Sequence, residues 1–328
     1  MQIIKPEKLK AGDSIGIVAP ATSASLISKR NLDMAKKKLE SFGLNVIYGK
    51  NIFKHHKLSI DGIKERINDL HSMFSSKKIK GIMAVIGGYS SNQLLPYLDY
   101  DLIRKNPKVF VGYSDITALQ NAIFQKTGLI TFSGPCFASF AQTHSPCEFE
   151  EEYFKKILMG RDFNVKLRPS KIWADDEWWK TPEKKRELKR NNGWKYIKKG
   201  KAKGIIIGGN LSTFLLLLGT AYLPDLRNKI LFIEEDPEMN RGMIERMFTQ
   251  LSQNNYFNKI SGLVIGRFSS KTNFSEKEEK KFLQTITLGL DIPVISNLDF
   301  GHTSPIITFP IGGTCEIDTS KNLIRLGY

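Results

Sequence analysis

Short apolar runs alternate with amphipathic stretches along the first half of the chain. Residues 14–19 form a short apolar run that is rich in β-branched side chains and is followed by Pro20, which predicts a buried strand. Residues 28–42 carry apolar side chains at helical spacing and are followed by Gly43, which predicts a helix with a glycine stop. The same reasoning predicts strands over 44–48, 80–86 and 109–112 and helices over 61–74 and 116–125. This order is typical of a parallel sheet covered by helices.

The pattern changes near residue 148. A helix is expected over 149–159, and a polar stretch, 166–203, follows it and contains all four tryptophans. We interpret this stretch as a partly mobile loop between two domains. Beyond it we expect strands over 204–207, 229–233 and 262–265, helices over 211–218 and 243–251, and short β-rich pieces over 306–326. The prediction is an α/β protein with an N-terminal domain over 1–165 and a smaller, β-rich α/β C-terminal domain over 204–328.

The net charge changes this picture little. The chain has 328 residues and a formal net charge of +16, which by itself could indicate a nucleic-acid partner. However, residues 180–203 hold nine lysines and two arginines against two glutamates, so more than half of the excess lies in one segment. Such a run is typical of a solvated face. No helix-turn-helix, zinc-finger or RNP-type pattern accompanies it, and we expect no nucleic-acid partner.

The sequence also indicates a cytoplasmic protein without a membrane partner. The first twenty residues lack the basic and apolar regions of a signal peptide, and the apolar run at 214–218 is too short to span a bilayer. The chain has three cysteines, Cys136, Cys147 and Cys315. Their odd number and wide spacing argue against a disulfide framework and a zinc cluster. A nucleophilic cysteine stays open as an alternative, although none of the three follows a strand at a glycine-bounded turn.

Ser114 is the strongest candidate for chemistry. It stands in VFVGYSDITAL, between an apolar strand that ends at Gly112 and a helix that begins near Ile116. A serine on such a turn lies at the carboxyl end of a sheet, where ligands bind in open α/β folds, and the following backbone N–H groups suit an oxyanion. Ile116 stands where a G-x-S-x-G elbow would have its second glycine. The alternative is that Ser114 or Asp115 only caps the helix.

Two further groups are candidates for the same site. Gly87 and Gly88 follow the predicted strand at 80–86 and would let the backbone approach a ligand, unless they form a plain turn. Glu234, Glu235 and Asp236 follow a predicted strand, and one of them could orient a histidine; the alternative is surface charge or a helix cap.

His302 is the histidine best placed to act as a base. It is one of five histidines, and the only one flanked by a glycine and by a turn before a β-rich run. A loop histidine there suits general-base catalysis, because its ordinary pKa lies near neutrality; it could also be a structural loop residue. No H-E-x-x-H and no close His/Asp cluster is present. We therefore expect no metal and no other cofactor.

Five segments in this order resemble the LD-carboxypeptidase family, the serine peptidases of the S66 type. They are GDSIGIVAPA, the run IGGYSSNQLLPYLDYDLIRKNPKVFVGYSDITAL, GGNLSTFLLLLGT, ILFIEED and GHTSPIITFPIGG. The resemblance extends over nearly the whole chain. It implies a Rossmann-like N-terminal domain, a smaller β-rich C-terminal domain and a homodimer. It also implies that Ser114 is the nucleophile, His302 the base and Glu234 the residue that orients the base, with backbone N–H groups of Gly88 and Asp115 as oxyanion donors.

Two features resemble the branch of this family that provides self-immunity against microcin C7. Ser91-Asn92 follows the glycine pair, and the segment DDEWW (175–179) lies in the long loop. The resemblance implies cleavage of an amide in an aminoacyl- or peptidyl-nucleotide conjugate, with Trp178 or Trp179 stacking on the base. The tryptophans could instead pack the loop onto a domain. The lysine-rich stretch after them departs from the branch, which leaves the placement of the loop open.

Two other functions stay open at this stage. One is a muramoyltetrapeptide LD-carboxypeptidase of murein recycling, whose substrate is a small peptide rather than a nucleotide-peptide. The other belongs to a different class, a non-catalytic ligand-binding protein with the same two-domain layout. Turnover of the two substrate types, with Ser114→Ala as the control, separates these readings.

Overall fold

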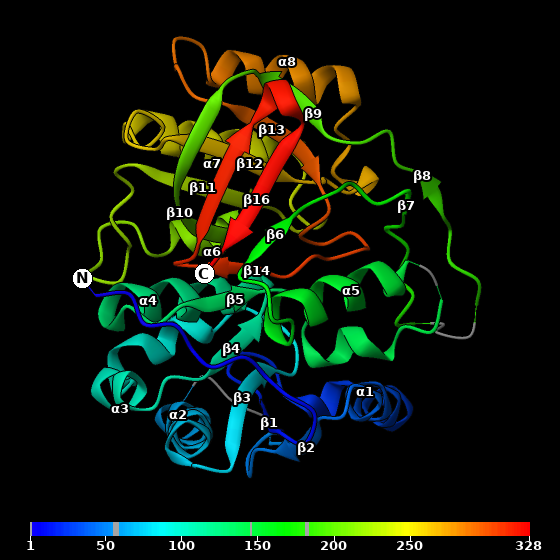
Figure 1. The fold of residues 1–328 in the computed structure, drawn as a ribbon, viewed down its shortest axis with the longest axis vertical. Coiled ribbons are helices and arrows are strands. Elements are labelled where there is room, and N and C mark those ends of the chain that lie inside the picture. The colour runs from blue at the N-terminus through cyan, green and yellow to red at the C-terminus, as the bar shows by residue number, and fades with distance from the viewer. Residues whose placement is uncertain (1, 55–58, 145, 181–183) are drawn as a thin grey trace.

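The computed structural model describes residues 2–54, 59–144, 146–180 and 184–328, and two sheets organise it (Figure 1). The first sheet has six strands in the order β14-β5-β4-β3-β1-β2, and all neighbours are parallel except β14 and β5. Its strands are β1 (Ser14–Val18), β2 (Asn45–Tyr48), β3 (Ile79–Ala84), β4 (Val109–Gly112), β5 (Thr131–Ser133) and β14 (Phe309–Ile311). The predicted parallel sheet is therefore present.

Helices lie on both sides of the first sheet, α1 and α5 on one side and α2, α3 and α4 on the other (Figure 1). They are α1 (Lys29–Ser41), α2 (Ile60–Ser75), α3 (Tyr100–Lys105), α4 (Thr117–Thr127) and α5 (Cys147–Leu158). The hydroxyl of Ser28 accepts the Asn31 N–H and starts α1, and Gly128, at a φ of 79°, ends α4. The sheet is thus buried on both faces, as its nearly continuous apolar strands require.

The second sheet has eight strands in the order β6-β16-β15-β10-β11-β12-β13-β9. They are β6 (Asn164–Lys166), β9 (Lys195–Lys198), β10 (Lys201–Asn210), β11 (Lys229–Glu234), β12 (Gly262–Gly266), β13 (Val294–Leu298), β15 (Thr314–Asp318) and β16 (Leu323–Gly327). The central strands β10 to β13 are parallel and the outer ones antiparallel. Its helices are α6 (Leu211–Leu215), α7 (Arg241–Gln253) and α8 (Glu276–Ile286). Short 3-10 segments lie at Ala24–Leu26, Ser91–Tyr97, Ser114–Ile116, Phe137–Ala141, Ser270–Thr272 and Thr319–Lys321.

The two sheets share one hydrophobic core. The rings of Phe232 in β11 and Phe309 in β14 lie 5.0 Å apart, which joins the sheets through aromatic packing. The helix that follows the candidate nucleophile, α4, is fixed to the second sheet by Asn121, whose amide exchanges hydrogen bonds with the backbone of Gly208 at 2.8 and 3.1 Å. Side chains from the two halves can therefore meet in a fixed geometry.

The sheets do not follow the predicted domain limits strictly. β6 begins at Asn164 but belongs to the second sheet, and β14 comes late in the sequence but belongs to the first. The stretch at 166–203 is not the plain loop that its polar composition suggested, because it contains β7 (Ile172–Trp173), β8 (Lys189–Arg190) and β9. Residues 181–183 of that stretch lie outside the described residues. Among the described residues, no helix combines the length and apolar character needed to cross a bilayer.

Candidate active site

Ser114 stands on a strained turn directly after β4. Its φ is +62°, in the left-handed region that residues other than glycine rarely adopt. Gly87 packs against it so closely that a Cβ added at Gly87 would lie 2.9 Å from Ser114 Cβ and 3.0 Å from Ser114 Oγ. The turn therefore aims the hydroxyl at the end of the sheet, and the glycine pair leaves it the space to do so.

Neither Ser114 nor Asp115 serves as a helix cap. The residue before α4 is Ile116, and no side chain caps this helix. Instead, Asp115 Oδ2 accepts the backbone N–H groups of Ser90 and Ser91 at 3.0 and 2.8 Å, while Ser91 Oγ donates to the Asp115 carbonyl at 2.5 Å. These bonds hold the loop after Gly88 against the turn that carries Ser114.

Arg66 supports the same loop from inside the protein. Its side chain is buried in α2, and its guanidinium donates to Ser90 Oγ at 2.9 Å and to Gln93 Oε1 at 3.1 Å. Burial raises the pKa of Asp115, and the bonds from Ser90 and Ser91, together with the charge of Arg66, oppose that shift. A buried cation and a buried carboxylate thus fix the backbone around the glycine pair.

His302 lies between Ser114 and Glu234. Its Nε2 is 3.0 Å from Ser114 Oγ, and its Nδ1 is 2.8 Å from Glu234 Oε2. Glu234, the last residue of β11, is only 3% exposed. The chain of contacts joins the carboxyl ends of β4 and β11, one from each sheet. This is the geometry of a serine, a base and a carboxylate that orients the base.

Two glycines make the space that Glu234 occupies. A Cβ added at Gly301 would lie 2.5 Å from Glu234 Oε2, and one added at Gly266 would lie 2.7 Å from Glu234 Cβ. Gly301 also has a φ of +106°, which strongly favours glycine. The glycine before His302 is therefore needed both for the backbone turn and for contact between the histidine and its carboxylate.

The loop that carries His302 begins at a buried ion pair. Arg267 Nη2 lies 2.6 Å from Asp299 Oδ1, and both side chains are at most 3% exposed. Asp299 also accepts the backbone N–H and the hydroxyl of Ser170 at 2.9 and 2.6 Å. This network connects the start of the 166–203 stretch to the base of the His302 loop.

The two acidic residues after Glu234 have different surroundings. Glu235 is buried and accepts Asn210 Nδ2 at 3.1 Å and the Ser212 N–H at 2.8 Å, so it holds the turn after β10. Asp236 turns the other way, and its Oδ2 lies 3.1 Å from His302 Nε2. The cluster of three carboxylates thus contains one partner for each ring nitrogen and one structural residue.

These charges decide the protonation of the site. Burial lowers the pKa of His302, but the charge and hydrogen bond of Glu234 and the charges of Asp236 and Glu235 outweigh it and raise the pKa to about 9. Burial, followed by the charge of Glu234, raises the pKa of Glu235 to about 7. Tyr113 packs its ring 5.2 Å from the imidazole. The free site therefore favours the imidazolium at neutral pH.

The 166–203 stretch lies beside the His302 loop. Ala174 and Ser304 exchange two backbone hydrogen bonds at 2.9 and 2.8 Å. Asp175 accepts Lys189 Nζ at 2.6 Å and the Ser270 N–H at 2.8 Å. Burial opposes these bonds, but they lower the pKa of Asp175 to about 2. The tryptophan-bearing segment is therefore anchored next to the site by charged hydrogen bonds.

The tryptophans of this segment are not equivalent. Trp178 is partly buried against the core, whereas Trp179 is 52% exposed, and their rings meet edge to face at 6.2 Å. Trp173 lies beneath two cations, Lys189 at 4.7 Å and Arg267 at 5.1 Å. Trp173 thus has a packing role, while Trp179 offers an open ring face.

An exposed tyrosine bridges the two halves beside the glycine pair. Tyr89 is 80% exposed, and its hydroxyl donates to Glu238 Oε2 at 2.9 Å. Glu238 belongs to the turn that follows Asp236. The sequence alone gave no reason to select Tyr89, Glu238 or Asn210, because their partners lie in the other half of the chain or in a separate segment.

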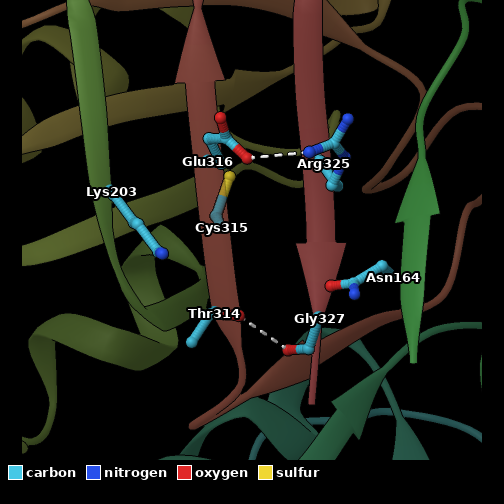
Figure 2. Close-up of a pocket in the computed structure, with 7 residues that line it drawn as sticks. All are labelled: Asn164, Lys203, Thr314, Cys315, Glu316, Arg325 and Gly327. Carbon is cyan, nitrogen blue, oxygen red and sulfur yellow. Dashed lines mark hydrogen bonds and ion pairs between the residues drawn. The ribbon is translucent and has the colours of Figure 1, made fainter.

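The cavity in Figure 2 lies apart from this chemistry, and Cys136 approaches the site as a buried thiol beside the Tyr113 backbone. All three thiols are buried, and burial raises the pKa of Cys136 and Cys147 to about 12, which disfavours the thiolate that a cysteine nucleophile needs. A cavity of about 520 Å³ opens over β10, β15, β16 and β6 (Figure 2). It is lined by Asn164, Lys203, Thr314, Cys315, Glu316, Arg325 and Gly327. None of these contacts Ser114, so the hollow is not the site.

Comparison with protein families gives two matches. The LD-carboxypeptidase N-terminal domain matches residues 15–134, and the LD-carboxypeptidase C-terminal domain matches residues 203–317. YocD of Bacillus subtilis, classed by name among the carboxypeptidases, is 42% identical over 97% of both chains. The microcin C7 self-immunity protein MccF of Escherichia coli is 33% identical, over 96% of this chain and 93% of its own. A second B. subtilis relative, named for murein peptide carboxypeptidase activity, is 30% identical over 97% of this chain and 92% of its own.

Solved structures agree with these matches. An MccF-like protein from Bacillus anthracis superposes with a TM-score of 0.93 at 40% identity and covers 98% of this chain and 99% of its own. MccF in complex with glutamyl sulfamoyl guanosine superposes with a TM-score of 0.90 at 33% identity, and MccF in complex with aspartyl sulfamoyl adenosine with 0.89 at 32%. Each of these two covers 98% of both chains. The similarity therefore extends over both sheets and the stretch between them.

Proposed function

Because this chain belongs to the LD-carboxypeptidase family and is a serine-type carboxypeptidase, we propose that Ser114, His302 and Glu234 form its catalytic triad. The observation that carries the proposal is the continuous contact from Ser114 Oγ through both ring nitrogens of His302 to the buried Glu234. The strained backbone at Ser114 supports the same assignment, since such strain is typical of functional sites.

In the proposed reaction Ser114 Oγ attacks the scissile carbonyl carbon while its proton passes to His302 Nε2. Glu234 accepts the hydrogen bond from Nδ1–H, which fixes the tautomer and stabilises the imidazolium. The tetrahedral intermediate then collapses, the C–N bond breaks, and the proton on Nε2 goes to the leaving nitrogen. A water molecule then attacks the acyl carbonyl carbon and gives its proton to His302 Nε2. The bond from that carbon to Ser114 Oγ breaks, and Nε2 returns the proton to Ser114 Oγ.

Backbone N–H groups of Gly88 and Asp115 are the proposed oxyanion donors. The turn at Ser114 and the loop after Gly88 are tied together through the Asp115 carboxylate, so the two N–H groups belong to one rigid unit. Misalignment of an oxyanion donor costs on the order of a hundredfold in turnover.

For the substrate, we propose an aminoacyl- or peptidyl-nucleotide conjugate whose amide is cleaved. Two observations support this class. MccF, which superposes over nearly the whole chain, has been solved with sulfamoyl nucleosides that carry an aspartyl or a glutamyl group. The segment beside the His302 loop also presents the exposed ring of Trp179 next to Trp178. Stacking of a base on such a ring stabilises binding by about 1–3 kcal/mol.

The test is hydrolysis of two substrates side by side. One is an aminoacyl sulfamoyl-adenylate, and the other is a muramoyl tetrapeptide that ends in an L-Lys–D-Ala or diaminopimelate–D-Ala bond. Cleavage of the conjugate alone is the expected result. Cleavage of the tetrapeptide alone identifies the murein-recycling alternative, which the relative named for murein peptide carboxypeptidase activity favours. If purified protein cleaves neither, the substrate proposal is wrong.

The two tryptophans are distinguished by single substitutions. Trp179→Ala should raise KM for the conjugate roughly tenfold and leave kcat nearly unchanged if its ring stacks on the base. Trp178→Ala is the matched comparison, and a KM effect confined to that variant assigns the stacking to Trp178. Trp173→Phe, beneath its two cations, serves as the packing control.

The remaining parts of the proposal concern assembly and location. We propose a cytoplasmic homodimer, as the family resemblance implies. Light scattering coupled to size exclusion tests the assembly, and a mass near twice the 37.2 kDa of one chain is expected. Cell fractionation tests the location.

A further inference from the structure

The imidazole of His302 has a carboxylate near each ring nitrogen. Glu234 Oε2 lies 2.8 Å from Nδ1, and Asp236 Oδ2 lies 3.1 Å from Nε2. Glu234 is the last residue of β11 and Asp236 follows two residues later, so both carboxylates reach the imidazole from the same strand end. Glu235, between them, points away toward Asn210. The position of Asp236 therefore follows from the strand that positions Glu234.

The side chain of Asp236 is held in this orientation by its own turn. Asp236 Oδ1 accepts the backbone N–H of Glu238 at 2.7 Å across Pro237, and the backbone N–H of Asp236 donates to Glu235 Oε1 at 2.8 Å. With Oδ1 used by the turn, Oδ2 is the oxygen presented to His302. Its side chain is 31% exposed, so water screens this contact only in part.

Nε2 is also the nitrogen that must accept the proton of Ser114. It can do so only as a neutral imidazole, whereas Asp236 interacts best with the imidazolium. The groups that face the ring are Glu234, Glu235 and Asp236 from the end of β11, and Tyr113 and Ser114 from the end of β4. All the ionisable groups among them favour the positive charge or are neutral.

We propose that Asp236 is a positioning residue that holds His302 in its protonated form and thereby sets the lower pH limit of the reaction. This inference rests on the proposed triad. In the free enzyme the carboxylate keeps the base occupied at neutral pH. A substrate group that neutralises or displaces Asp236 on binding releases the base for Ser114.

The experiment compares the wild type with Asp236→Asn, Asp236→Ser and Glu238→Gln. Asn and Ser keep an oxygen that can accept the Glu238 N–H, so both preserve the turn while removing the charge. Glu238→Gln removes a charge from the same turn. It is the matched control, because the Glu238 carboxylate accepts the Tyr89 hydroxyl instead of facing the imidazole.

Two readouts are measured. The first is the histidine carbon-bound proton signal of His302 in NMR spectra of histidine-labelled protein, assigned by His302→Gln and titrated from pH 5 to 10. The second is kcat/KM over the same range. Removing a charge at this distance should lower the titration midpoint and the acid limb of kcat/KM by about one pH unit or more. At a pH below the titration midpoints of both proteins, kcat/KM of the Asp236 variant should be roughly threefold higher than that of the wild type. The reason is that the gain in the fraction of neutral imidazole exceeds the loss of base strength.

The outcomes separate this inference from the proposed function. Lower midpoints in both Asp236 variants, with Glu238→Gln unchanged, support it. A midpoint within about 0.3 unit of the wild type in either folded Asp236 variant overturns it, as does an equal shift in Glu238→Gln. The NMR titration requires no substrate, so an inactive preparation would contradict the proposed function and still test Asp236.

Discussion

The site joins two regions that contribute different properties. The ends of β3 and β4 supply a constrained backbone. Ser114 has a φ of +62°, and a Cβ added at Gly87 would lie 3.0 Å from Ser114 Oγ. The end of β11 and the His302 loop supply charge, with three carboxylates that raise the pKa of the histidine to about 9. In the proposed mechanism, the first region determines where the Ser114 hydroxyl lies, and the second determines the pH at which His302 can accept its proton. Substitutions in the two regions should therefore fail in different ways.

The largest effect is expected for Ser114→Ala. It removes the nucleophile and should lower kcat/KM by about 10⁴-fold or more. The melting temperature should change little, because Ala keeps the Cβ and the turn. Steady-state kinetics and thermal melts check this. A variant that retains more than about a hundredth of the activity contradicts the assignment of Ser114.

The next largest effect tests the charged region. Glu234→Gln keeps the shape of the buried side chain but removes the charge that orients and stabilises the imidazolium. Turnover should fall on the order of 10³-fold, and the titration midpoint of His302 should move to lower pH. Glu235→Gln is the comparison, since Glu235 holds the Asn210 turn instead of the imidazole. Equal losses of turnover in the two variants would argue against a special role for Glu234.

A smaller effect tests the backbone region alone. Gly87→Ala places a Cβ 2.9 Å from that of Ser114 and should shift the nucleophile by a few tenths of an ångström. We expect kcat to fall roughly a hundredfold while the His302 titration midpoint stays unchanged. Gly242→Ala is the control, because its added Cβ meets only Asn240 Oδ1 at 3.4 Å. If Gly87→Ala moves the His302 midpoint, the two regions are not separable in this way.

The smallest effect concerns Glu150, a buried carboxylate of α5 that lies outside both regions and should influence stability instead of turnover. Glu150 is 3% exposed and accepts Gln142 Nε2 at 3.2 Å, and Gln142 in turn accepts a hydrogen bond from the buried Arg186. Burial raises the pKa of Glu150 to about 8. Its folded-state pKa exceeds the unfolded value of about 4.5, so the stability that it contributes is complete below that pH and is lost as the pH rises through about 8.

Glu150→Gln should therefore flatten the pH dependence of the free energy of unfolding. Between pH 5 and 8.5 the wild type should lose on the order of 2 kcal/mol more than the variant. Urea unfolding at several pH values measures this difference. Glu151→Gln, on the same helix and in a partly exposed ion pair with Lys38, should follow the wild type. Parallel curves for the wild type and Glu150→Gln would show that Glu150 is not protonated in the folded state.

The sequence predicted the parts of the fold that depend on local pattern. The strand at 109–112 and the helices around residues 28–42 and 61–74 are present to within one or two residues, because apolar periodicity and Ser or Gly caps are local signals. α8 and β13 were not predicted. Strand β6 joins the second sheet and β14 the first, which no local pattern encodes, because these pairings depend on contacts far apart in the sequence.

The candidate site shows the same division. Ser114, Glu234 and His302 were selected from their turns, their residue types and the family resemblance, and the structure brings them together. The contact between Asp236 and His302 and the bridge from Tyr89 to Glu238 could not be predicted, because each joins residues at least 66 positions apart. The stretch at 166–203, interpreted as a partly mobile loop between two domains, also contains short strands that its polar composition conceals. Charged hydrogen bonds of Asp175 and Arg186 anchor it.

The most direct test of the central claim is covalent labelling of the nucleophile. The wild type, Ser114→Ala and His302→Gln are incubated with a fluorophosphonate at pH 7 and pH 9, and the adduct is located by peptide mass spectrometry. We expect one adduct, on Ser114, that forms faster at pH 9 and is lost in Ser114→Ala and nearly lost in His302→Gln. An adduct on another residue, or equal labelling of the wild type and His302→Gln, would contradict it.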